Sequence, residues 1–193
     1  IENMAGSRAA AASVAPGDVD FTSVGFGTIE KTTLQDRIYE ELRYALIRGH
    51  FVPGDNLTIR SLASVVGTSI VPVRDALQRL TAERALVLQP NRSASVPVMT
   101  RREFDDLMKI RLRLECLAIE EAAPAVTPAL VDMLAECNQN MLRAIEDRNI
   151  QMVLAENMKL HFLLYRLSDN ELLLDIIEKL WVRMGPMLRM PFR

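Results

Sequence analysis

The segment from Leu57 to Val98 constrains the fold more than any other part of this chain. Its first half holds two apolar stripes at helical spacing, separated by the polar turn of residues 67–69, Gly-Thr-Ser. The stripes consist of Leu57, Leu62, Ala63 and Val66, and of Val73, Ala76, Leu77 and Leu80. The pattern predicts two short helices across a tight turn. Pro72 falls in the first turn of the second helix, where its missing N–H costs little.

A two-stranded hairpin is predicted directly after the second helix. Residues 85–88 and 94–98 flank a turn-rich tip that contains Arg92. A hairpin in this place forms a wing beside the helix-turn-helix. The exposed face of the second helix is expected to carry Arg74 and Arg79, which gives it the shape and charge to enter a DNA major groove. We therefore interpret the segment as a reader of double-stranded DNA.

The distribution of charge agrees with this interpretation. The 193 residues carry a formal net charge of −2, but residues 31–99 contain nine Lys and Arg against six Asp and Glu, whereas residues 100–193 contain thirteen against fifteen. The basic excess therefore coincides with the motif. Because the excess is small, we expect tight binding to need two copies of the domain on one DNA site.

The chain is divided into three parts by its patterning. Residues 1–30 are rich in Ala, Ser, Gly and Asp without periodicity, and are expected to form a flexible N-terminal tail. Residues 31–99 are predicted to form the winged helix-turn-helix DNA-binding domain, which begins with a helix over residues 34–48. A helical domain over residues 100–193 follows, and a capping box of Thr100 and Glu103 opens it.

Every segment of the second domain has a helical pattern with short breaks. Its predicted helices span residues 101–122, 128–148, 150–167 and 170–188. Such short connections favour an antiparallel bundle. The expected fold class is therefore mainly α, with a small β-hairpin wing in the first domain and an all-α antiparallel bundle in the second.

Cysteine usage and hydropathy indicate a cytoplasmic protein. Cys116 and Cys137 lie on predicted helices and lack metal-type spacing, so two buried free thiols in a reducing compartment are expected. No apolar run approaches the ~18 residues that a membrane span needs, so no membrane partner is expected.

The motifs of the first domain are closely similar to the GntR superfamily of bacterial transcription factors. The similar residues are Gly49-x-x-x-Pro53-Gly54-x-x-Leu57, Leu62-Ala63-x-x-x-Gly67-Thr68-Ser69, Pro72-Val73-Arg74-Asp75-Ala76-Leu77-x-x-Leu80 and Pro90-Asn91-Arg92. The helical continuation, with Arg111-x-x-x-Glu115 and Asn157-x-x-x-His161-Phe162, resembles the FadR subfamily with its FCD-type ligand domain. In that family the domain continues through further helices that carry two more histidines, so the helical domain here is expected to be incomplete.

The resemblance implies a ligand-responsive transcriptional regulator, a repressor that binds a palindromic operator as a homodimer. Arg74 is then expected to contact a base edge, and Arg60 and Arg92 to contact phosphate or the minor groove. Thr68 and Ser69 can offer hydroxyl and N–H groups to a phosphate, although helix capping explains them equally well. An ordinary solvated arginine is the alternative for each cation.

The sequence also departs from the family pattern beside these positions. Ile70 stands where a basic residue is common, and Val71 replaces a usual hydroxyl residue. The operator is therefore expected to differ from the usual family palindrome.

The effector is expected to be a small-molecule carboxylate, because many FadR-type proteins sense organic acids. Arg111 matches the family's arginine position and can clamp a carboxylate, while pairing with Glu115 or Asp106 is the alternative. Asn157 and His161 are the other candidate effector contacts. The family holds a divalent metal such as Zn²⁺ with Asp and His at these two positions, and the neutral Asn157 leaves a weak, incomplete set.

Two other function classes are alternatives to a ligand-responsive regulator. A metal-dependent enzyme that uses His161 is disfavoured, because the sequence has no nucleophile–base pair and no complete ligand set, so the chain is not expected to be an enzyme. A DNA-binding protein whose helical domain only dimerises and senses nothing stays open. Calorimetry with a panel of carboxylates would separate it from a sensor.

Overall fold

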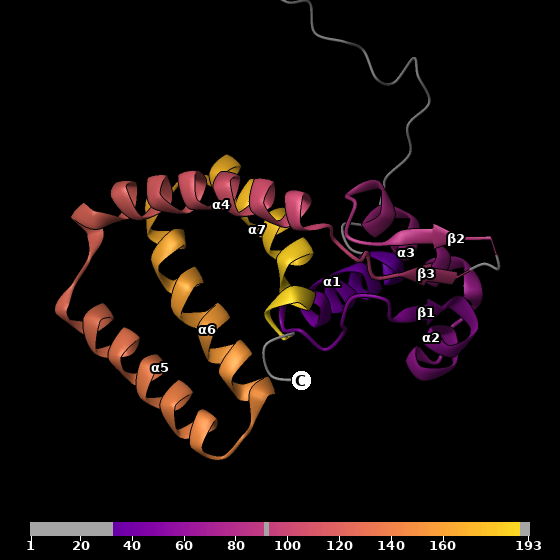
Figure 1. Cartoon of the computed structure of the whole chain (residues 1–193), viewed down its shortest axis with the longest axis horizontal. Helices are drawn as coiled ribbons and strands as arrows, with labels where there is room; N and C mark the ends of the chain where they lie inside the picture. The colour runs from indigo at the N-terminus through magenta and orange to yellow at the C-terminus, as the bar shows by residue number, and fades with distance from the viewer. Residues whose placement is uncertain (1–32, 91–92, 190–193) are drawn as a thin grey trace, which may run out of the picture. The chain divides into compact units, whose positions relative to one another are not determined.

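The elements of the winged helix come first along the chain (Figure 1). The computed structural model describes residues 33–90 and 93–189. The predicted tail, residues 1–30, lies outside the described residues. The elements are α1 (Leu34–Ile47), β1 (Asn56–Thr58), α2 (Ile59–Val66), α3 (Ile70–Ala82), β2 (Val87–Gln89) and β3 (Ser93–Ser95).

Local chemistry explains the helix-turn-helix. The Thr58 side chain accepts a hydrogen bond from the backbone N–H of Ser61 and begins α2. Gly67 ends α2 with a φ of 72°, in the left-handed region that glycine adopts without a steric penalty. α3 starts three residues later and has Pro72 in its first turn. The predicted helix-turn-helix is confirmed.

The wing contains one strand more than predicted. β3 lies between β1 and β2 in an antiparallel sheet, where Ala94 pairs with Leu57 on one side and with Leu88 on the other. The two predicted strands are present but shorter. The sequence pattern predicts a helix at β1, because Leu57 continues the apolar spacing of α2. The strand that pairs with β1 is nearly 40 residues away in the chain, and local spacing does not reveal such a partner.

The second half of the described chain is helical. Its elements are α4 (Arg101–Ala122), the 3₁₀ turn Ala123–Ala125, α5 (Pro128–Glu146), α6 (Ile150–Tyr165), the 3₁₀ turn Arg166–Ser168 and α7 (Glu171–Leu188). The expected capping box begins α4: the backbone N–H of Thr100 donates to Glu103 Oε2 at 2.7 Å, and the N–H of Glu103 donates to the Thr100 hydroxyl. α5 and α6 run side by side as a hairpin (Figure 1).

α1 and α7 share one hydrophobic core. Leu46 and Ile47 of α1 belong to the same buried cluster as Trp181 and Val182 of α7. At the crossing, a Cβ built on Gly185 would lie 2.1 Å from the carbonyl oxygen of Leu46. The two backbones therefore touch, and only glycine fits there. The division into two domains at residue 100 stays a prediction, because buried residues from both sides of it form this single cluster.

Further contacts lie at both ends of the α1–α7 crossing. The Arg43 guanidinium pairs with the Glu178 carboxylate, and Arg189 Nη1 donates to the carbonyl oxygens of Gly49 and His50 at 3.3 Å. Helix α7 is thus fixed to the winged helix by an apolar contact, an ion pair and a C-terminal bond to the α1–β1 loop.

The expectation of two buried thiols is right for Cys137 and wrong for Cys116. Both cysteines are free, but Cys116 is exposed on α4. Burial raises the pKa of the Cys137 thiol above its usual value. Helical spacing alone did not distinguish the buried from the exposed face of α4, whose apolar residues occur all round. Among the described residues, no helix combines the length and hydropathy that a bilayer span requires.

We predict that Gly185→Ala destabilises the protein. Alanine is a better helix former than glycine by about 1 kcal/mol, so propensity alone would raise stability. The added methyl group meets the α1 backbone instead, and such overpacking costs about 1–3 kcal/mol. The thermal unfolding midpoint, followed by circular dichroism, should fall by several degrees. An unchanged or higher midpoint would show that the two helices can separate at no cost.

Candidate DNA-binding and effector sites

Helix α3 has one buried face and one free face. Val73, Ala76, Leu77 and Leu80 are buried. Ile70 and Val71 at the start of the helix are 41% and 55% exposed, and Arg74 is half-buried one turn later. Apolar side chains at the N-terminal end of a recognition helix can contact the methyl group of thymine, and an arginine beside them can contact guanine. The free face of α3 therefore has the chemistry of a major-groove reader.

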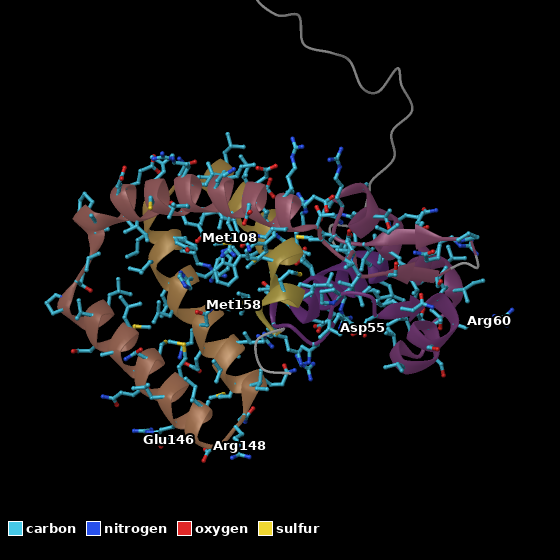
Figure 2. The ribbon with its side chains drawn as sticks, in the orientation of Figure 1. Asp55, Arg60, Met108, Glu146, Arg148 and Met158 are labelled. Carbon is cyan, nitrogen blue, oxygen red and sulfur yellow. The ribbon has the colours of Figure 1, made fainter. Side chains whose placement is uncertain are left out.

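The two described arginines predicted to contact DNA have no acidic partner. Within residues 33–90 and 93–189, neither Arg60 nor Arg74 forms an ion pair. Figure 2 shows the Arg60 side chain pointing away from the ribbon. Arg92, the predicted wing contact, lies outside the described residues.

Ser69 and Thr68 lie at the turn before α3. Ser69 is the N-cap residue and is exposed, but its side chain forms no capping hydrogen bond. Thr68 is half-buried, and its backbone N–H donates to the Ala63 carbonyl oxygen at 3.0 Å. The capping explanation therefore fails for the Ser69 side chain, whose hydroxyl stays available to a phosphate.

Arg79 does not belong to the free face that we expected it to share with Arg74. Its Nη1 lies 3.1 Å from Asp36 Oδ1, and its guanidinium carbon lies 3.8 Å from the centre of the Tyr39 ring. The Tyr39 hydroxyl in turn donates to Glu83 at 2.8 Å. Burial and the Glu83 carboxylate raise the pKa of Tyr39 well above its usual value. Arg79 thus holds α3 against α1.

A second group of polar side chains surrounds Glu115 of α4. Its carboxylate accepts hydrogen bonds from Arg111 Nε at 2.7 Å, from Trp181 Nε1 at 3.0 Å and from the Tyr165 hydroxyl at 2.9 Å. The Arg111 guanidinium also lies over the Trp181 ring, 4.7 Å from its centre. We call Arg111, Glu115, His161, Tyr165 and Trp181 the Glu115 cluster.

The hydrogen bonds of the Glu115 cluster fix the tautomer of His161. The Tyr165 hydroxyl has a single hydrogen, and it donates this hydrogen in a hydrogen bond to the Glu115 carboxylate, which can only accept. The 2.9 Å contact between the Tyr165 oxygen and His161 Nδ1 then requires Nδ1 to carry the hydrogen. In the neutral ring, Nε2 is left with a free lone pair. Burial lowers the pKa of His161, which favours this neutral form.

The predicted effector residues lie in different environments. Arg111 is buried and paired with Glu115, which is the alternative that its helical spacing offered. Asn157 is half-buried one turn before His161 on α6. The sequence analysis did not identify Tyr165 or Trp181 as members of this cluster. For Tyr165 a signal existed, because it follows His161 by four residues and therefore lies on the same helix face.

The described residues do not fit a bound metal ion. In those parts of the chain, no three His, Cys, Asp or Glu side chains gather closely enough to hold one. Asn157 and His161 together offer two neutral ligands, whereas a zinc site in a protein uses three or four. No step of the function is therefore assigned to a metal.

Two family models match the chain. Residues 34–96 match the model described as bacterial regulatory proteins, gntR family, and residues 106–193 match the FCD domain. The HTH-type transcriptional regulator McbR of Escherichia coli (strain K12) is 33% identical over 162 residues, which cover 84% of this chain and 73% of the relative. The Nta operon transcriptional regulator of Aminobacter aminovorans is 30% identical, over 68% of this chain and 62% of the relative.

Solved structures with the same fold include two bacterial proteins. E. coli McbR/YncC superposes with a TM-score of 0.78 at 32% identity, covering 83% of this chain and 76% of that one. A putative GntR regulator from Rhodococcus sp. RHA1 superposes with a TM-score of 0.67 at 23% identity, over 82% of this chain and 76% of that one, and at this identity it shows the fold alone.

Arg74→Ala should lower affinity for a specific duplex far more than for random duplex. Loss of one bidentate base contact removes about 1–3 kcal/mol of discrimination. Arg60→Ala should weaken binding to both duplexes alike and reduce the salt dependence by about one counterion, because phosphate contacts carry no sequence information. Fluorescence anisotropy on a duplex selected from a random pool measures both effects.

Arg143→Ala on α5 is the matched control, since it removes an exposed arginine of the helical half. It should leave both affinities unchanged. If Arg74→Ala reduces binding to the two duplexes equally, Arg74 does not read bases.

Proposed function

The chain belongs to the GntR family of bacterial transcriptional regulators, in its FCD-containing, FadR-like subfamily, and we propose that it acts as a homodimeric repressor that a small organic acid controls. It is a DNA-binding regulator and not an enzyme. Repression is proposed because relatives carry that description, among them the HTH-type transcriptional repressor RspR of E. coli, 24% identical over 76% of this chain and 64% of the relative.

The free face of α3 is the observation that carries the proposal. Ile70 and Val71 are exposed in the first turn of α3, and Arg74, which forms no ion pair with any described residue, follows one turn later. An exposed apolar pair is unfavourable in water, and it becomes favourable against thymine methyl groups in a major groove. The departure of Ile70 and Val71 from the family pattern therefore supports an operator with thymine at the contacted positions.

The proposed homodimer rests on the operator and on α4. A palindrome needs two readers about one helical turn apart, and one winged helix has only a small basic excess. Met108, Leu112 and Ile119 recur along α4 at spacings of four and seven residues and are 37–62% exposed. A second copy that covered this stripe would remove it from water.

The proposed effector contacts are Arg111, Asn157 and His161. Glu115 already neutralises Arg111, so the groups left for an organic acid are the Asn157 amide and, when His161 is protonated, its Nε2–H. The buried ion pair supports a sensing role over a purely structural one, because an apolar replacement of similar volume is often at least as stable. A helical domain that only dimerises stays the alternative proposal.

The operator and the homodimer are tested together. We expect two chains to bind one palindromic duplex obtained by selection from a random pool, with mass photometry giving the mass of two chains plus one duplex. A duplex with one half-site destroyed should bind at least about tenfold more weakly, because the second domain then makes only non-specific contacts. One chain per palindrome at saturation, or equal affinity for the two duplexes, would contradict the proposal.

The chain is expected to hold little metal as isolated, because two neutral ligands bind a divalent ion weakly against water. Asn157→Asp supplies a charged oxygen and should raise zinc affinity measured by competition with a coloured chelator. His161→Ala in the Asn157→Asp background should reverse the gain. Elemental analysis that finds one zinc per unmodified chain after dialysis against chelator would refute this expectation.

A further inference from the structure

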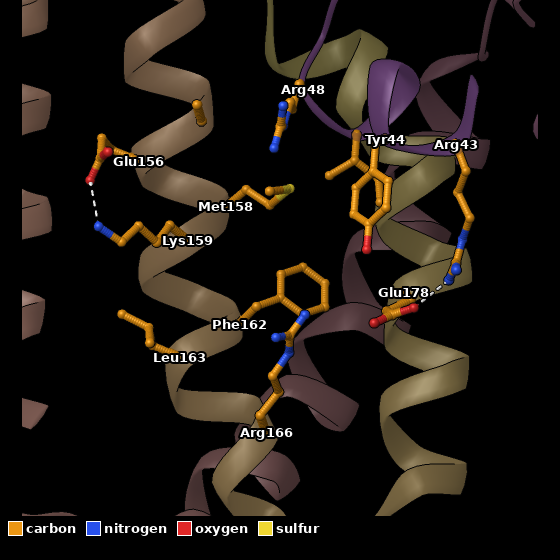
Figure 3. A pocket seen from close by; sticks show the side chains of 12 residues that line it. Arg43, Tyr44, Arg48, Glu156, Met158, Lys159, Phe162, Leu163, Arg166 and Glu178 are labelled. Atoms are coloured by element: carbon orange, nitrogen blue, oxygen red, sulfur yellow. Dashed lines mark hydrogen bonds and ion pairs between the residues drawn. The ribbon is translucent and has the colours of Figure 1, made fainter. Parts of the chain in front are cut away.

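A cavity lies between α1 of the winged helix and the helices α6 and α7 (Figure 3). Its volume of about 340 Å³ falls at the lower end of the range for small-molecule sites, roughly 300–1,000 Å³. The cavity takes one wall from the half of the chain that reads DNA and the other from the helical half. A ligand held here would touch both.

The α6 wall of the cavity is apolar in its middle. Met158 and Phe162 lie one turn apart on α6 and face the cavity, and Ile47 contributes from α1. Apolar walls with a few polar groups at the margin are typical of sites for small organic ligands, because the walls bind the body of the ligand and the polar groups orient it.

Positive charge exceeds negative charge around this cavity. Its four cationic side chains face only two carboxylates. The carboxylate of Glu178 pairs with Arg43. Glu156 Oε2 lies 3.9 Å from Lys159 Nζ, close enough for an ion pair but too far for a hydrogen bond, and this buried oxygen has no hydrogen-bond partner among the described residues. Each acidic group therefore has a cationic neighbour, and two further cations remain.

The other two cations, Arg48 and Arg166, have no acidic partner among the described residues. Figure 3 shows both side chains directed into the space beside Met158 and Phe162. Arg48 directly follows α1, and Arg166 directly follows α6. In addition, Arg43 Nε is buried and has no hydrogen-bond partner within the described part of the chain. Unsatisfied donors around an apolar space favour an anionic occupant.

We propose that this cavity binds a compact organic carboxylate, with its anionic group on Arg48 and Arg166 and its apolar body against Met158 and Phe162. The Tyr44 hydroxyl is a further polar group at the cavity. The site is additional to the proposed effector residues Arg111, Asn157 and His161, because His161 bonds within the Glu115 cluster and does not line the cavity.

A carboxylate in this cavity has a direct path to the DNA-binding surface. Arg48 caps the C-terminal end of α1, and α1 packs against α3, the helix that carries Arg74. A ligand that contacts both α1 and α6 favours conformations in which these two helices stay close together. If such conformations fit the operator better or worse than the others, the ligand changes DNA affinity by that difference. This second step, unlike ligand binding, rests on the proposed function.

Calorimetry with benzoate and with its neutral analogue benzamide tests the site directly. Benzoate should bind saturably with one site per chain and a Kd below about 1 mM, whereas benzamide should show no saturation up to about 10 mM. Arg48→Gln and Arg166→Gln should each weaken benzoate binding at least about tenfold, since each removes a charge-assisted hydrogen bond. Both side chains are exposed enough that the variants should unfold at the temperature of the unmodified protein.

A control variant separates this site from other anion binding. Arg143→Gln removes an exposed arginine of α5 that does not line the cavity, and it should leave benzoate affinity unchanged. Equal binding of benzoate and benzamide, unchanged affinity in both Arg48→Gln and Arg166→Gln, or no saturation by benzoate would each overturn the proposal.

The coupling to DNA is measured separately, by anisotropy on the selected duplex with and without benzoate. Benzoate should shift the DNA Kd by about fivefold or more in the unmodified protein and leave it unchanged in Arg166→Gln. If benzoate binds as expected and the DNA Kd does not move, the site stands and its regulatory role is wrong. If no duplex is selected at all, the proposed repressor function fails while calorimetry still decides the site.

Discussion

The backbone contact between α1 and α7 is the constraint on which the rest of the structure depends. Gly185 has no side chain, and the main chain of α1 fills the place that a Cβ would take. That approach brings Trp181 and Val182 of α7 into the same core as Leu46 and Ile47 of α1. The recognition helix α3 packs on α1 in turn, so the position of the DNA-binding surface follows from a contact made far from it.

Charged side chains fix the structure at two other places. Arg79 joins α3 to α1 through Asp36 and the Tyr39 ring, and Glu115 joins α4 to α6 and α7 through Tyr165 and Trp181. The bonds of Glu115 are largely buried, so removing one partner there leaves a desolvated polar group, which costs more than the intact bond contributes. The Arg79–Asp36 pair is exposed, so its contribution to stability is smaller. Both arrangements orient the helices, because they set which face of each helix points inward.

The sequence predicted the features that local rules determine. The capping box at Thr100, the turn at Gly67 and the bounds of α4 each depend on residues within one helical turn, and all three agree with the structure. The roles of Arg79 and Glu115 depend on partners 43 to 66 residues away, and no local pattern marks them. Cys116 was misassigned for a related reason, since a helix with apolar residues on several faces shows its buried side only after it packs.

The α1–α7 contact also has a consequence for synthesis of the chain on the ribosome. Gly185 follows Leu46 by about 140 residues, so the apolar side of α1 that faces α7 is made long before its cover. At about 5–20 residues per second this interval is roughly 7–30 s, in which a nascent winged helix exposes an unpartnered hydrophobic surface. A molecular chaperone or a neighbouring nascent chain therefore has a defined time window in which to bind it.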